Sequence, residues 1–201
     1  MPGVHNCFNL TFLSAALRKT QVKQASARKK KMKKILLSIS LLLSGCLGYP
    51  DTVTPVDGFE LEKYLGKWYE IARLDHSFER GLEAVSAEYT IRKDGGVRVK
   101  NRGFSVEKKK WSESIGKAYF VEDENLGYLK VSFFGPFYGS YVIFELDKEE
   151  YQYAFVTSSK QSYLWFLSRT PTVSQELKER FKKKIQEKGF EPEDLIWVNQ
   201  K

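Results

Sequence analysis

From Gly66 to Arg169, apolar side chains alternate with charged and polar ones, and many of the apolar residues are aromatic or β-branched. Turn-forming residues interrupt this alternation at short intervals, which is the pattern of consecutive short strands. Asp94, Gly95 and Gly96, for example, form a tight hairpin signal. The pattern predicts eight strands, at residues 67–74, 84–93, 96–104, 112–121, 126–134, 140–146, 151–158 and 163–169.

The period changes after the last of these strands. Pro171 breaks the strand pattern, and Thr172 with Gln175 matches a capping box at the start of a helix. Apolar residues then recur every four positions, as on one face of a helix, at Leu177, Phe181 and Ile185. Gly189 is a suitable C-cap, and residues 195–198 are expected to form one more short strand.

These elements predict an all-β protein, an eight-stranded antiparallel up-and-down β-barrel with one C-terminal α-helix packed outside. Closing the sheet on itself removes its exposed edges. A barrel of eight strands encloses a lumen wide enough for its own side chains or for one small ligand. The apolar stripe of the helix is narrow, so we expect the helix to cover the outer wall.

A different pattern lies near the N-terminus. Lys33 and Lys34 precede a run of apolar residues and serines at 35–43, and small residues then lead to Cys46. The run is too short to cross a bilayer core of about 30 Å as a helix, so we interpret it as a cleaved signal segment. The Leu-Ser-Gly-Cys junction resembles the bacterial lipoprotein signal, which implies that Cys46 is acylated. The alternative is an ordinary secretory signal that ends in cysteine.

The chain therefore divides into four segments. We interpret residues 1–31 as a misassigned upstream extension, because Met32-Lys33-Lys34 is itself a suitable start for a signal peptide. The alternative is an organellar presequence, because residues 1–31 are basic and lack acidic residues. Residues 32–45 are the predicted signal peptide, residues 46–56 a lipidated tether, and residues 57–201 the barrel domain.

The charge balance excludes one class of partner. The whole chain has a formal net charge of +8, but residues 1–45 hold nine of its 33 basic residues and none of its 25 acidic ones. The remainder is close to neutral, so we expect no nucleic-acid partner. Beyond the leader the chain has one cysteine, Cys46, and one histidine, His76. We therefore expect no disulfide, no metal site and no cofactor.

Three short motifs point to a family. Gly66-Lys67-Trp68 opens the first predicted strand, Arg169 ends the eighth, and a less regular match, residues 146–151, lies between the sixth and the seventh. In this order they resemble the signatures of the lipocalins. The stretches HSFERGL, KVSFFGPFYG and YLWFLSRTPT are similar to those of bacterial outer-membrane lipoprotein lipocalins, relatives of apolipoprotein D.

The resemblance implies a structural role for the motif residues Gly66, Trp68 and Arg169. In lipocalins the tryptophan and the arginine pack together at the closed end of the barrel. A guanidinium over an indole contributes about 0.5–2 kcal/mol. We therefore expect Trp68 and Arg169 to close the barrel floor without touching a ligand.

Alternation along each strand predicts which side chains face the lumen. The predicted inward, ligand-lining residues are Val85, Ala87, Tyr89, Val99, Asn101, Ala118, Phe120, Val131, Phe133, Tyr141, Ile143, Tyr163 and Trp165. Ile91 falls on the same face by alternation, and Gly116 is expected to leave space beside Ala118. This wall is apolar with a few polar groups, which suits an elongated lipid with one polar end. The alternative is a barrel filled by its own aromatic side chains.

The loop at residues 75–81 is expected at a lid position, where Phe78 could cap the mouth of the barrel and His76 is interpreted as a solvated loop residue. Phe134, Phe137 and Tyr138 gather near another turn, and such an apolar patch marks a membrane or partner surface. Self-association into a homodimer through this patch is an open alternative.

The leading functional prediction is a binding protein, not an enzyme. It would hold a fatty acid or a lysophospholipid and be anchored by its N-terminal lipid to the outer membrane, facing the periplasm. Leu47 follows the cysteine where an aspartate would favour retention in the inner membrane. The sequence lacks a recognisable nucleophile–base pair. The alternatives are a lipocalin-fold enzyme acting on a lipid, with Glu70 as a candidate buried acid, and a structural envelope lipoprotein with a filled barrel.

Overall fold

The computed structural model describes residues 47–201. The predicted signal segment and Cys46 lie outside the described residues, so their roles stay predictions. No helix in the described part of the chain is long and apolar enough to cross a membrane.

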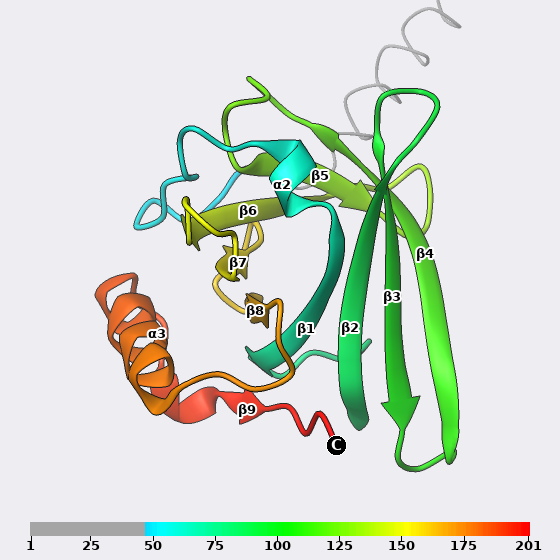
Figure 1. Ribbon diagram of the computed structural model, residues 1–201, viewed down its shortest axis with the longest axis vertical. Helices are drawn as coiled ribbons and strands as arrows, with labels where there is room; N and C mark the ends of the chain where they lie inside the picture. Colours follow the sequence, from blue (N-terminus) through cyan, green and yellow to red (C-terminus); the bar gives the residue numbers. More distant parts are fainter. Residues whose placement is uncertain (1–46) are drawn as a thin grey trace, which may run out of the picture. The chain divides into compact units, whose positions relative to one another are not determined.

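Eight antiparallel strands form the wall of the molecule (Figure 1). Each strand pairs with the next in the chain, and β1 pairs with both β2 and β8, so the sheet closes into a barrel. The predicted fold class is confirmed. The strands are β1 (Gly66–Arg73), β2 (Leu82–Ile91), β3 (Val97–Ser105), β4 (Lys110–Phe120), β5 (Tyr128–Ser132), β6 (Gly139–Leu146), β7 (Tyr153–Thr157) and β8 (Leu164–Ser168).

The remaining elements lie before and after these strands. A short helix, α2 (Leu61–Tyr64), precedes β1. After β8 come the helix α3 (Gln175–Glu187), the 3₁₀ turn η1 (Pro192–Asp194) and the short outer strand β9 (Ile196–Trp197), which pairs with β1. The expected final strand therefore exists.

The predicted start of the C-terminal helix is wrong by two residues. Ser174, not Thr172, is the N-cap, and its side chain accepts a hydrogen bond from the Leu177 amide. The predicted end is confirmed. Gly189 has a positive φ of 81°, and the amides of Gly189 and Phe190 donate to the carbonyls of Gln186 and Ile185. These two bonds are the pattern that closes a helix at a glycine.

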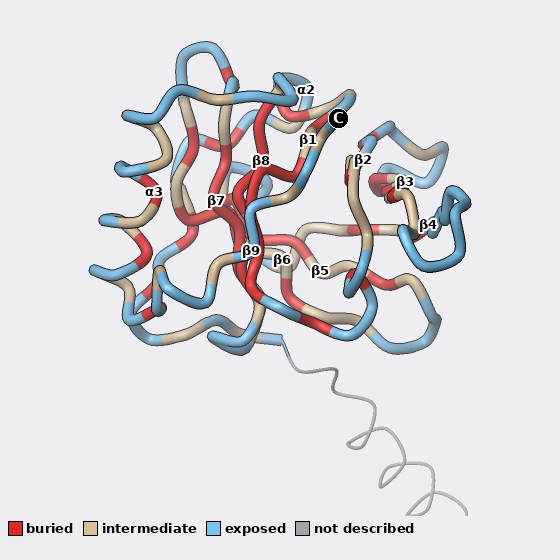
Figure 2. Tube along the Cα trace, turned by 90° about the horizontal axis from the view of Figure 1, so that it is seen from below, coloured by how far each residue is buried: buried red, intermediate tan, exposed pale blue. Residues whose placement is uncertain are grey.

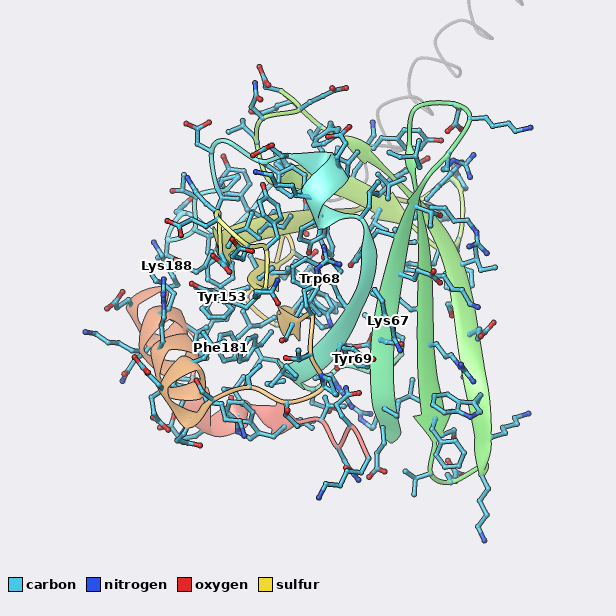
Figure 3. The ribbon with its side chains drawn as sticks, in the orientation of Figure 1. Lys67, Trp68, Tyr69, Tyr153, Phe181 and Lys188 are labelled. Atoms are coloured by element: carbon cyan, nitrogen blue, oxygen red, sulfur yellow. The ribbon has the colours of Figure 1, made fainter. Side chains whose placement is uncertain are left out.

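Buried residues form two separate cores, one on each face of the sheet. In Figure 2 buried stretches run along β1, β7 and β8 and recur on the side of α3 that faces them. The interior core lies inside the barrel and includes Tyr64, Trp68, Tyr89, Val99, Ala118, Ile143 and Leu167. The helix-side core lies between the outer wall and α3 and includes Ile71, Phe144, Phe155, Phe166, Phe181 and Ile185. In Figure 3 Phe181 points from α3 toward the barrel, and its ring lies 4.7 Å from that of Phe155. The segment before the barrel also packs against the helix-side core, where Val53 is 2% exposed.

The two ends of the barrel differ. Trp68 and α2 lie at the end where β1 begins, which we call the closed end. Because neighbouring strands are antiparallel, the loops after β2, β4 and β6 also lie at the closed end. The loops after β1, β3, β5 and β7 lie at the other end, which we call the open end.

The wall between β1 and β2 is completed by the C-terminal residues. β1 pairs with β2 only through residues 66–69, and beyond that point β9 pairs with β1 instead. The Gln200 side-chain amide donates to the carbonyls of Glu70 and Val85 at 2.7 and 2.9 Å. This side chain therefore bridges two strands whose backbones have separated.

Candidate ligand-binding site

The closed end is built by the three motif residues. The Arg169 guanidinium lies 4.0 Å from the centre of the Trp68 ring. It also donates to the carbonyls of Tyr151, Lys67 and Lys63, at 3.2, 3.0 and 2.6 Å. Gly66 has a positive φ of 91°, a conformation that suits glycine. The stacking expected between Trp68 and Arg169 is therefore present.

A layer of tyrosines covers this floor inside the barrel. The Tyr141 hydroxyl lies 2.7 Å from the hydroxyl of Tyr64 and 2.8 Å from that of Tyr89. Burial raises the pKa of all three phenols, so each stays protonated and can donate. Sequence reasoning missed Tyr64, because it assigned no helix or strand before residue 67. The apolar spacing of Phe59 and Tyr64 was the available signal.

The residues predicted to line a ligand site occupy three environments. Tyr89, Val99, Ala118 and Ile143 are buried in the interior core. Half-buried side chains that pack against this core are those of Ala87, Phe120, Val131, Phe133, Tyr141 and Trp165. These six side chains are therefore partly exposed to solvent.

Three further residues of the predicted set lie nearer the open end. Val85 is buried against Gly103 of β3. Asn101 has a buried Oδ1 without a hydrogen-bond partner among the described residues. The Tyr163 ring stacks at 6.0 Å on Trp165 and contacts the loop after β1.

Two expectations about the wall are wrong. Ile91 is 52% exposed, because β2 ends there at the rim of the closed end. Gly116 does not leave space, because a Cβ at this position would lie 2.9 Å from the Phe133 ring. The aromatic ring of the neighbouring strand fills the space that the glycine provides.

A buried polar cluster lies beside this wall, and we define it as Glu70, Arg73, His76 and Glu79. All four side chains belong to residues that are at most 6% exposed. Arg73 donates to Glu70 Oε1 at 2.8 Å and to the Glu79 carbonyl at 2.9 Å. His76 Nε2 lies 3.0 Å from Glu79 Oε2, which also accepts from Trp165 Nε1 at 3.1 Å.

A β-bulge brings this cluster together. The register of β1 against β8 shifts between Glu70 and Ala72, so Glu70 and Arg73 turn to the same side although they are three residues apart. Sequence reasoning placed His76 in solvent, and this is wrong, because His76 is 6% exposed under Phe78. The signal was a charged or imidazole side chain at every third position from 70 to 79.

The pKa values of the two carboxyl groups in the polar cluster are shifted in opposite directions. Burial raises the pKa of Glu70 well above its usual range, and the charge of Glu79 adds to this. Burial also works against ionisation of Glu79, but His76, Trp165 and Arg73 together hold its pKa below the usual value. Of the two carboxyl groups, that of Glu79 is therefore the one that is more readily ionised.

Phe78 lies over the polar cluster at the open end. Its ring stacks on His76 at 4.0 Å and on Tyr163 at 6.0 Å, yet the residue is 59% exposed. This agrees with the expectation that Phe78 lies at the mouth. The ring separates His76 from bulk water.

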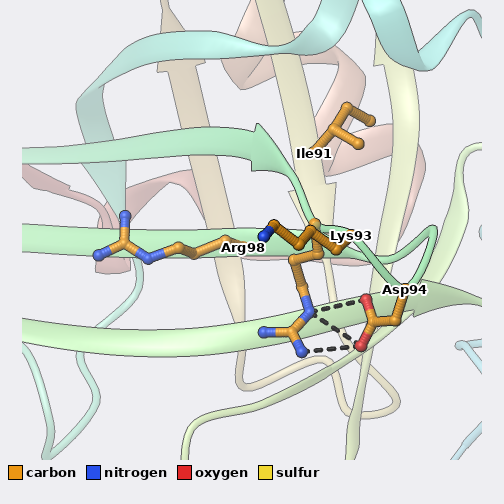
Figure 4. Close-up of a pocket in the computed structure, with 5 residues that line it drawn as sticks. Ile91, Lys93, Asp94 and Arg98 are labelled. Atoms are coloured by element: carbon orange, nitrogen blue, oxygen red, sulfur yellow. Dashed lines mark hydrogen bonds and ion pairs between the residues drawn. The ribbon is translucent and has the colours of Figure 1, made fainter.

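A hollow on the outer surface lies away from this interior. It is lined by Ile91, Arg92, Lys93, Asp94 and Arg98 at the hairpin between β2 and β3 (Figure 4). Arg92 and Asp94 form an ion pair across the turn, and Tyr119 donates to Asp94 at 3.0 Å. These contacts brace the hairpin at the closed end, so we assign no ligand to the hollow.

The closed barrel, the Trp68–Arg169 floor and the outer helix agree with one family. The family model described as Lipocalin-like domain matches residues 59–200. The chain belongs to the lipocalin family. This lipocalin is 61% identical over 165 residues to "Outer membrane lipoprotein Blc" of Vibrio cholerae. The aligned region covers 82% of this chain and 96% of the relative.

More distant members share the same domain. "Outer membrane lipoprotein Blc" of Escherichia coli K12 is 50% identical, covering 75% of this chain and 85% of the relative. "Temperature-induced lipocalin-1" of Arabidopsis thaliana is 33% identical, covering 68% and 76%. Among solved structures, insecticyanin of Manduca sexta superposes with a TM-score of 0.61 at 21% identity, covering 76% of this chain and 87% of that one.

Proposed function

We propose that this lipocalin is an outer-membrane lipoprotein that binds one fatty acid or lysophospholipid inside its barrel and carries out no chemical reaction on it. The observation that carries the proposal is the pairing of two environments in one interior. Half-buried apolar and aromatic side chains line the wall, and the buried polar cluster lies beside them near the open end. A long acyl chain suits the first and a polar head suits the second.

The relatives support the location. Two relatives at 61% and 50% identity carry the name outer membrane lipoprotein. A single acyl chain gives only marginal membrane binding, so stable anchoring needs more than one lipid chain. We propose that Cys46 provides that attachment through the lipoprotein modification that its junction resembles.

Native mass spectrometry of the purified full-length protein tests the ligand. After addition of oleate or lysophosphatidylethanolamine we expect one lipid per chain. A chain that takes up neither lipid, and that carries none when purified, would support a filled structural barrel instead. Conversion of the added lipid to a product of different mass would favour the enzyme hypothesis.

A pair of neighbouring substitutions in β2 locates the ligand. Ala87 packs in the interior, whereas the next residue, Ser86, lies on the other face of the strand. Ala87→Phe should fill the lumen and reduce the bound fraction at least tenfold, and Ser86→Phe should leave it unchanged. Equal loss in both variants, or in neither, would place the lipid elsewhere.

The lipid anchor needs its own experiment. Labelled palmitate should enter the wild-type chain in a bacterial host and should not enter Cys46→Ser. Equal labelling of the two chains would contradict acylation at Cys46.

A further inference from the structure

The open end carries an exposed surface that the ligand site does not use. It consists of Lys108, Lys109, Lys110 and Trp111 at the hairpin between β3 and β4, and of Phe134 and Phe137 in the loop after β5. We call it the cationic–aromatic face. Trp111 is 47% exposed, Phe134 81% and Phe137 68%. Exposed aromatic rings are unfavourable in water, and a group of them indicates a surface that contacts a membrane or a partner.

The two parts of this face lie along the same edge of the sheet, about 20 Å apart at roughly 3.3 Å per residue of β4. β4 pairs with β5 only through Lys117–Phe120, so residues 110–116 of β4 extend past the end of β5. The loop that carries Phe134 and Phe137 begins where β5 ends, opposite Lys117. In Figure 1 this free edge of β4 runs down to the hairpin tip, and the loop after β5 lies beside its upper part.

The hairpin tip and two loops of the closed end carry opposite charge. The tip has three exposed lysines against one glutamate, Glu107. The closed-end loops after β4 and β6 have one lysine, Lys148, against six acidic residues: Glu122, Asp123, Glu124, Asp147, Glu149 and Glu150. An anionic surface would therefore attract the hairpin tip and repel these two loops, which favours one orientation.

We propose that the cationic–aromatic face docks this lipocalin on a bilayer surface rich in anionic phospholipid. Lysines near such a surface are attracted to lipid phosphates, and tryptophan and phenylalanine rings partition into the headgroup region. Arg102 lies 3.9 Å over the Trp111 ring and so holds the indole on the outer face of the hairpin. Docking would bring the open end of the barrel to the lipid that it loads.

A second copy of the chain is the alternative occupant of this face, and sedimentation distinguishes it from a bilayer. The inference rests on the proposed function, because a lipid carrier must meet the surface that supplies its ligand. Vesicle contact and lipid uptake are measured independently of each other.

Fluorescent labels at the two ends of the barrel test the contact. The full chain with Cys7→Ser and Cys46→Ser receives an environment-sensitive label at Phe137→Cys or, as the control, at Lys93→Cys in the closed end. Vesicles contain equal parts of phosphatidylglycerol and phosphatidylcholine, or phosphatidylcholine alone. The label at position 137 should shift to the blue with the anionic vesicles, and the label at position 93 should not. The position of the label reports which face is in contact, whatever else holds the chain to the vesicle.

Lysine variants test the origin of the attraction. Replacing Lys108, Lys109 and Lys110 together by serine should weaken the vesicle response about 100-fold, since each lysine contributes about a fivefold factor. Raising the salt concentration should weaken the wild type in the same direction. The matched control replaces Lys182, Lys183 and Lys188, on and after α3, by serine and should change little.

Several outcomes would overturn the inference. The first is an equal blue shift of the labels at positions 93 and 137. The second is a blue shift that depends neither on phosphatidylglycerol nor on the three lysines. The third is a blue shift without vesicles, accompanied by a dimer in analytical sedimentation. Oleate binding is measured on the same lysine variant by native mass spectrometry. Retained binding with a lost vesicle response supports the inference, whereas vesicle contact without any lipid uptake would refute the proposed function alone.

Discussion

The indole Nε1 of Trp165 donates a hydrogen bond to Oε2 of Glu79 over 3.1 Å, and this bond ties β8 to the loop after β1. Trp165 is half-buried against the interior core, so its fluorescence should report a lipid that enters. Titration with oleate should shift or quench the emission of the wild type and saturate near one lipid per chain. In Trp165→Phe most of that response should be lost, whereas Trp197→Phe, altered on the outer strand β9, should keep it. An undiminished response in Trp165→Phe would remove Trp165 from the site.

Glu79 should make stability depend on pH. Its pKa is held below the usual value in the folded protein, so the unfolded chain binds the proton more tightly. The stabilisation is therefore present above the unfolded pKa, about 4.3, and is lost as the pH falls through the lower folded pKa. Glu79→Gln should be less stable than the wild type by about 1–3 kcal/mol at pH 6, and the difference should shrink toward pH 3. Urea unfolding across this range measures it, and a constant difference would show that the charge of Glu79 is not responsible.

Arg169→Ala should destabilise the barrel without affecting its ligand. The change removes the stacking on Trp68 and three hydrogen bonds to carbonyl groups. We expect a loss of about 2–3 kcal/mol in the free energy of unfolding. Arg169→Lys keeps the charge without the planar fork and should recover only part of it, while Arg98→Ala serves as a control with little effect. Unchanged stability together with lost oleate binding would make Arg169 a ligand residue.

Gln200→Ala should loosen the wall between β1 and β2. It removes the donor that bridges the carbonyls of Glu70 and Val85. Hydrogen exchange should accelerate at the amides of Val198 and Ala84, which bond to Ile71 and Asn199. A loss of about 1–2 kcal/mol in the free energy of unfolding should accompany it. Gln186→Ala, at an exposed position of α3, is the control. Equal exchange rates in the two variants would show that the Gln200 bridge has no role.

The barrel could be predicted from the sequence because alternation is a strong local signal. In β8, for example, Trp165 and Leu167 face inward and Leu164 and Phe166 pack on the helix side, as a period of two requires. The stacking of Trp68 and Arg169 could also be predicted, because both residues lie in family motifs. Strand ends were less accurate. The predicted strand at 151–158 starts at Tyr153, because Tyr151 has a positive φ of 54° in the preceding turn.

The polar cluster could not be predicted, because it depends on an irregularity that alternation does not encode. One extra residue in β1 turns Arg73 inward beside Glu70, and only then do His76 and Glu79 find buried partners. The N-cap was also mispredicted, because it is Ser174 whose hydroxyl accepts from a free amide of the first turn, that of Leu177. Local patterns predicted the wall and missed the contacts that form once distant segments meet.

The bridge made by Gln200 has a consequence for the order of folding. It joins residues that are 130 and 115 positions apart in the chain. Contacts between such distant residues carry a large loop-closure cost and slow folding. On a chain made from its N-terminus, β1 and β2 emerge early, while the residues that join their separated halves emerge after α3. The seam beside the polar cluster is therefore the last part of the barrel that synthesis can complete.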